Sequence, residues 1–197
     1  MPEQADSVMT LYNTFILRDI LSYFLPGVII LISLYFFVSS GLSDFESLIS
    51  RLLSMTGIFF VIGAALAYLV GFAIGCLAEA IGLTSQFSGA HYLNDMDYYK
   101  HGLLPFLRKS SRTEYQQYER FMMLKQTAVN GLIAFLVTAF IFLVKFIQYP
   151  SIISNMYFAV GCAIFCAILM IGYLKYASRL EYWREAVNET VKDTKEA

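Results

Sequence analysis

Residues 57–82, GIFFVIGAALAYLVGFAIGCLAEAIG, are the part of this chain that says most about its fold. This apolar run carries very small residues at spacings of three and four, namely Ala64, Ala67, Gly71, Gly75, Ala78 and Gly82. At about 100° per residue, the six positions lie within an arc of about 80° on one helix face. Helices in a bilayer associate through close backbone approach, which small residues permit. The row therefore predicts a packing face, either inside one bundle or, as a subunit interface or pore-lining surface, between copies of the chain.

The composition is typical of a membrane protein. The mean hydropathy is +0.60, 58% of the residues are hydrophobic and only 15% are charged. The apolar residues gather in four stretches, at about 20–40, 57–78, 127–148 and 152–174. Each has about 20 residues, enough for a helix to cross a hydrocarbon core of about 30 Å. The predicted class is an all-α polytopic membrane protein with four transmembrane helices and cytoplasmic helical extensions.

The chain divides into five parts on this interpretation. Residues 1–19 form an N-terminal amphipathic cytoplasmic helix, and 20–83 hold transmembrane helices 1 and 2 with a short outer loop. Residues 84–126 form a cytoplasmic loop and helix, 127–175 the transmembrane hairpin of helices 3 and 4, and 176–197 a cytoplasmic C-terminal helix.

Two helices are expected to extend beyond the membrane. Ser111 and Glu114 fit a capping box, which predicts one long helix from Arg112 through the third span. The fourth span continues into the tail, where an apolar seam recurs at spacings of three, four and four: Leu180, Trp183, Val187 and Val191. Such a seam requires a partner helix. The partner is either the helix that begins at Arg112, a neighbouring subunit, or a soluble cytoplasmic protein.

The distribution of basic residues predicts the orientation. When the N-terminus, middle loop and tail share one side, twelve of the fourteen Lys and Arg residues lie on that side. By the positive-inside rule, both termini and the middle loop are cytoplasmic.

Charged and polar residues near the span ends suggest further roles. Glu79 follows a run already long enough to cross the bilayer, so we expect it at the inner interface, paired with a Lys or Arg; a gate or ion site is the alternative. Lys145 is expected to reach the outer surface. Asn130 and Asn155 could hydrogen-bond between helices, and Pro26 predicts a local bend in the first span.

The basic cytoplasmic layer is a candidate contact for a ligand or partner. It combines cations with aromatic rings: Arg108, Lys109, Arg112, Tyr115, Tyr118 and Arg120. Arginine and aromatic faces can hold phosphates and stack on bases, which would suit a nucleotide or oligonucleotide. The same composition serves the lipid bilayer through its anionic headgroups.

Catalytic signatures are missing from the sequence. It contains none of the motifs G-x-S-x-G, H-E-x-x-H, Walker A or G-x-G-x-x-G. His91, Asp95, Asp97 and His101 match no closed metal-binding spacing. We therefore expect no enzyme activity, no cofactor and no metal.

The runs RDILSYFLPG at 18–27 and AYLVG at 67–71, with the four-span layout, resemble small membrane proteins of bacterial anti-phage defence systems. These include the membrane subunit of the Kiwa system and membrane effectors of nucleotide-signalling defence. The resemblance implies a protein of the bacterial inner membrane that forms homo-oligomers and either senses infection for a soluble partner or damages the membrane when triggered.

The sequence therefore suggests three functions. The first is a non-enzymatic oligomeric subunit that senses membrane perturbation or recruits a soluble cytoplasmic partner. The second is a nucleotide-gated pore, and the third is a small transporter that depends on Glu79.

Overall fold

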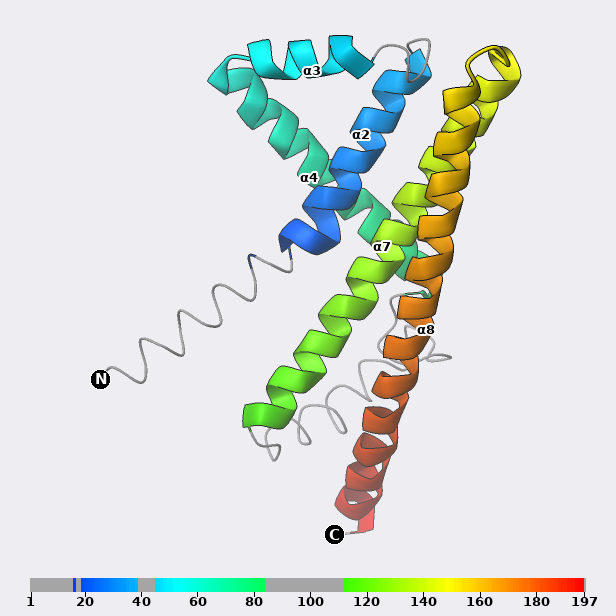
Figure 1. Cartoon of the computed structure of the whole chain (residues 1–197). Helices are drawn as coiled ribbons and strands as arrows, with labels where there is room; N and C mark the ends of the chain where they lie inside the picture. The colour runs from blue at the N-terminus through cyan, green and yellow to red at the C-terminus, as the bar shows by residue number, and fades with distance from the viewer. Residues whose placement is uncertain (1–15, 17–18, 39–44, 84–111, 197) are drawn as a thin grey trace.

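The computed structural model describes residues 16, 19–38, 45–83 and 112–196, with side chains in the two longest helices for 116–118 and 120–180. Within these ranges the chain is helical and contains no strand (Figure 1). The elements, in order, are the π-helix η1 (Ile20–Phe24), α2 (Leu25–Val38), α3 (Phe45–Ser54), α4 (Gly57–Ala80), α7 (Arg112–Gln148) and α8 (Ile153–Glu196).

Four helical segments are long and apolar enough to cross a membrane, which confirms the predicted class at that level. They are Ile20–Val38, formed by η1 and α2, then Gly57–Ala80, Gln116–Gln148 and Ile153–Leu180. The third and fourth belong to unbroken helices of 37 and 44 residues, as the capping box and the tail seam predicted. At about 1.5 Å per residue, α8 is about 66 Å long, roughly twice the thickness of a hydrocarbon core.

The long helices α7 and α8 lie side by side along their apolar lengths (Figure 1). Aromatic rings join them at two levels: Phe135 stacks on Phe165, with ring centroids 5.3 Å apart, and Phe142 contacts Phe158 at 4.6 Å. Since a tight turn connects the helices at 149–152, they form an antiparallel hairpin as expected.

The segment expected to be a short outer loop contains the helix α3. It lies across the ends of α2 and α4, at the same end as the α7–α8 turn (Figure 1). Leu48 is buried in a cluster with Phe36, Phe142 and Ala159. Glu46 in the first turn and Arg51 in the last turn suit the helix dipole. The predicted short outer loop is therefore wrong in one respect, because Phe45–Ser54 is helical.

The small-residue face of α4 packs against the first span of the same chain. Gly27 lies so close to α4 that an added Cβ would overlap the carbonyl oxygen of Ala67. In the reciprocal contact, a Cβ on Gly71 would overlap the carbonyl oxygen of Tyr23. The two backbones are therefore in direct contact, and only glycine fits at these two positions.

A proline in the first span explains the π-helix beside this contact. Pro26 has no N–H, so the carbonyl of Ser22, four residues earlier, has no α-helical donor. The N–H of Leu25 pairs instead with the carbonyl of Ile20, five residues back, which is π-helical geometry. The structure therefore has a π turn directly before Pro26, the position where the sequence predicts a bend.

Asn130 of α7 satisfies the Ser22 carbonyl. Its Nδ2 donates to that oxygen at 2.6 Å, and the side chain is 0% exposed. The hydroxyls of Ser22 and Thr127 add a second contact at 2.9 Å. The expected interhelical hydrogen bond of Asn130 is confirmed, and it joins α7 to the first span where α4 also packs.

Replacing Gly71 with alanine should destabilise the fold by about 2–3 kcal/mol, because the added methyl group displaces the Tyr23 backbone. The control is Gly161→Ala on α8, where nothing lies within 4 Å of the added carbon. That change should be neutral or stabilise by up to about 1 kcal/mol. Denaturant unfolding of the detergent-solubilised protein, followed by circular dichroism, measures both. Equal stabilities of the two variants would contradict the backbone contact.

Asn130→Ala should cost about 1–2 kcal/mol, because the Ser22 carbonyl then lacks its donor. In a Pro26→Ala background the residue at 26 regains an N–H, so the same substitution should cost about 1 kcal/mol less. Thr138→Val is the control, since Thr138 bonds Ser33 at 2.7 Å, away from Pro26. Its cost should be the same in both backgrounds. A double-mutant cycle on unfolding free energies tests this, and strict additivity for Asn130 would refute it.

Candidate functional site

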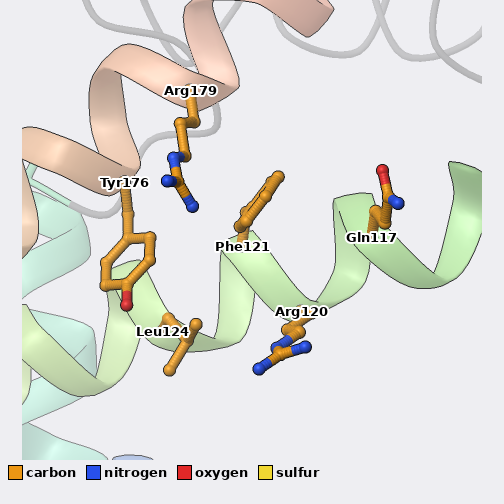
Figure 2. Close-up of a pocket in the computed structure, with 6 residues that line it drawn as sticks. All are labelled: Gln117, Arg120, Phe121, Leu124, Tyr176 and Arg179. Atoms are coloured by element: carbon orange, nitrogen blue, oxygen red, sulfur yellow. The ribbon is translucent and has the colours of Figure 1, made fainter.

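A pocket lies between α7 and α8 at the end of the bundle opposite their connecting turn. Its volume is about 330 Å³, and Figure 2 shows its lining residues on the two helices. Four come from α7 and two from α8: Gln117, Arg120, Phe121 and Leu124, then Tyr176 and Arg179. Their spacings of three and four put each set on the face that its helix turns to the other. The pocket therefore forms where α7 and α8 continue as helices beyond their most apolar segments.

The pocket combines stacked aromatic rings with a cation. Arg179 extends from α8 toward α7 and lies over the Phe121 ring, with its Cζ 5.3 Å from the ring centroid (Figure 2). Phe121 in turn stacks with Tyr176, at 6.3 Å between centroids and 29° between planes. A guanidinium held against a ring keeps its N–H groups available in its own plane for a carboxylate or phosphate.

The charged residues that line the pocket, among those the structure describes, are both arginines. In the part of the chain that the structure describes, no carboxylate lies within ion-pair distance of Arg120 or Arg179. One turn deeper, Lys125 is buried, with its Nζ 5.7 Å from the centroid of the Tyr173 ring. The two exposed guanidiniums are suited to an anionic ligand, because charge-assisted hydrogen bonds are the strongest that such groups form.

The residues predicted for this layer are distributed unevenly. Arg120 lines the pocket, whereas Tyr118 is buried and does not line it. Arg112 and Tyr115 lie in the first turn of α7. Their side chains, and the whole of Arg108 and Lys109, are outside the described residues.

Of the residues that line the pocket, the sequence analysis named only Arg120, and it missed Gln117, Phe121, Leu124, Tyr176 and Arg179. A signal was available on α7, where 117, 120, 121 and 124 recur at helical spacing. Their pairing with 176 and 179 was not visible, because it depends on the register of the α7–α8 hairpin.

The small-residue row is buried in its middle and exposed at its far end. Ala67, Gly71, Gly75 and Ala78 are buried, and Ala64 is half-buried. A Cβ on Gly75 would lie 2.7 Å from the Tyr23 ring, so this position also faces the first span.

Gly82 is a correction to the predicted packing row. It follows the end of α4, is exposed, and has nothing within 4 Å of an added Cβ. Its φ of +75° and the bond from the Leu83 N–H to the Ala78 carbonyl, at 3.0 Å, form a glycine C-cap. Its role is therefore helix termination.

The other ionisable candidates also have definite places. Glu79 is exposed in the last turn of α4, and no described lysine or arginine pairs with it.

Lys145 differs from expectation: it is only 6% exposed, and its Nζ lies 5.3 Å from the Phe37 ring centroid and 5.4 Å from that of Tyr149. The aromatic residues around the hairpin turn cover a side chain that was expected to reach the surface.

The remaining predictions concern the tail and the middle segment. Leu180, the first seam residue, is buried, and Trp183, Val187 and Val191 follow on the same unbroken helix, with side chains outside the described set. His91, Asp95, Asp97 and His101 lie in a segment outside the described residues.

Comparison with protein-family models, with curated proteins and with solved structures found no match to this chain. Its class is therefore defined by its own features: a helical protein with four helices long and apolar enough to span a membrane, and a basic, aromatic pocket where the two longest helices continue past their apolar segments.

Proposed function

We propose that this chain is a non-enzymatic, oligomeric subunit of the bacterial inner membrane, with both termini cytoplasmic. In this role it senses membrane perturbation and recruits a soluble cytoplasmic partner as part of a defence complex. The observation that carries the proposal is the continuity of α8, which runs unbroken from its apolar span to Glu196 and carries the apolar seam on its polar extension.

The packing of α7 on α8 supports the sensing role. The pair is joined along its length by ring contacts and by the approach of Leu169 to Gly131, 3.2 Å from an added Cβ. Rigid, closely packed helices move as a unit, so a change in their tilt within the bilayer displaces the extension by a proportional amount. A partner bound at the seam would experience that displacement.

Because the small-residue row packs within the chain, we expect contacts between copies to use a different surface. Since Ala67, Gly71, Gly75 and Ala78 are buried against the chain's own helices, their face is not free to contact a second copy. Most of the apolar length of α8, in contrast, is exposed, including the small residues Ala163 and Ala167. The exposed side of α8 and the tail seam are the surfaces that an assembly would use.

The pocket favours a second candidate function, a nucleotide-gated pore. Arg120 and Arg179 beside stacked rings are suited to a phosphate attached to a base. Liposome conductance distinguishes this candidate: a pore would conduct when ligand is added, and a recruiting subunit would not. The transporter hypothesis has less support, because Glu79 is exposed at the end of α4.

The recruiting role predicts that the seam binds a soluble protein. Wild-type chain purified from its native membrane should carry one soluble protein at fixed stoichiometry. The double substitution Val187→Glu and Val191→Glu should reduce that protein at least about tenfold, because it puts two charges into an apolar contact. The control, Ala186→Glu with Asn188→Glu, adds the same charge off the seam and should retain the partner. Quantitative mass spectrometry of the purified complexes provides the measurement, and equal recovery from both variants would refute the role.

The defence assignment is tested separately in the native host. Deleting the chain should raise the plating efficiency of at least one phage by about tenfold or more, and a plasmid copy should restore protection. Seam variants that lose the partner should also fail to protect. Unchanged plating across a broad phage panel would contradict the defence role while leaving the membrane architecture unaffected.

A further inference from the structure

We propose that the pocket between α7 and α8 binds the phosphate of an anionic phospholipid headgroup. The proposal goes beyond the recruiting role: it requires the four apolar helices to lie in a bilayer but does not require a soluble partner.

The depth of the pocket is the first argument. The apolar part of α7 begins near Thr127 and that of α8 ends near Leu174. At about 1.5 Å per residue, Arg120 lies about 10 Å and Arg179 about 8 Å beyond those limits. The headgroup layer extends about 5–8 Å beyond the hydrocarbon on each side, and long arginine side chains can reach back into it. Both guanidiniums are therefore within reach of lipid phosphates.

The donor set is the second argument. The Arg179 guanidinium lies over the Phe121 ring, whereas Arg120, which also lines the pocket, projects from α7 on the side away from Arg179 (Figure 2). Each guanidinium offers N–H donors of its own to a phosphate. Basic pockets between helices at the headgroup level are a common way to hold anionic lipids.

The apolar surface below the pocket is the third argument. Leu124 is the lining residue of α7 that lies nearest in sequence to the apolar part of that helix. Further into the bilayer, α8 presents Ile168 and Phe165, which are 56% and 53% exposed, and Phe165 stacks on Phe135 of α7. An acyl chain attached to a phosphate in the pocket would lie against this surface. A free nucleotide would make no use of it.

The volume of the pocket also fits a headgroup. At about 330 Å³ it lies at the lower end of the range of about 300–1,000 Å³ found for small-molecule sites. It has room for a phosphate and a small polar group while the rest of the lipid remains outside.

The test measures lipid retained by the full-length protein. The protein is reconstituted in nanodiscs containing equal amounts of phosphatidylglycerol and phosphatidylcholine, released into detergent, and its bound lipids are counted by native mass spectrometry. The wild type should retain phosphatidylglycerol in preference to phosphatidylcholine by at least about tenfold. Arg120→Gln with Arg179→Gln should remove that preference. No preference in the wild type would overturn the proposal.

Two further variants separate a specific site from general charge. Arg51→Gln is the matched control, because Arg51 also lies over an aromatic ring, 6.0 Å from the Tyr35 centroid, but on α3 at the opposite end of the bundle. It should keep the preference. Leu124→Trp fills the pocket while leaving both arginines, and it should abolish the preference. Two outcomes would refute a specific site. One is that Arg51→Gln loses the phosphatidylglycerol preference as fully as the double variant does, and the other is that Leu124→Trp keeps the preference unchanged.

A soluble arm distinguishes lipid from free phosphates. Adenosine triphosphate and glycerol 3-phosphate are titrated onto wild-type protein in phosphatidylcholine nanodiscs. Neither should bind below about 1 mM, because neither has the acyl chains that add apolar contact. The opposite outcome would be tight nucleotide binding by the wild type that the double variant Arg120→Gln with Arg179→Gln loses, while that variant retains lipid as the wild type does. That outcome would overturn the lipid proposal and support the nucleotide-gated pore.

Discussion

The direct contact between the backbones of the first span and α4 is the constraint on which the rest of the bundle depends. Gly27 and Gly71 each meet a carbonyl of the opposite helix, at Ala67 and Tyr23. Without hydrophobic drive inside a bilayer, such close approach supplies the dispersion contacts that hold helices together. A side chain at either position would separate the helices and remove those contacts along the whole crossing.

The same crossing determines where α7 lies. Pro26 leaves the Ser22 carbonyl without a helical donor, and Asn130 provides one at 2.6 Å. Leaving this buried carbonyl without a donor costs about 1–2 kcal/mol, so the bond favours one position and one rotation of α7. Once α7 is placed, the ring contacts along α8 place the fourth span, and the pocket forms where the two helices continue past their apolar segments. The candidate ligand site is thus linked to the glycine contact through a chain of packed helices.

The proposals for the two ends of this hairpin are compatible. A subunit that reports on the state of the membrane needs contact with lipid and a rigid connection to the cytoplasm. The pocket would supply the first at the headgroup level, and the extension of α8 the second. An anionic lipid bound between the helices would stabilise one relative arrangement of α7 and α8, because a ligand shifts an equilibrium toward the state it binds better.

The sequence by itself determined the helical class, the four helices long and apolar enough to span a membrane, and the two long helices. Length, hydropathy and capping are local properties that a helix expresses wherever it packs. The sequence also predicted Asn130 as an interhelical donor and named Arg120 as a candidate ligand contact. Only the tertiary structure decided that the glycine row contacts Tyr23 and the first span, that Gly82 ends a helix, that aromatic rings cover Lys145, and that Arg179 completes a pocket begun by Arg120. The physical reason is common to all four. One-dimensional spacing gives the face on which a residue lies, whereas its function depends on the register and crossing of a second helix, and contacts distant in sequence set both.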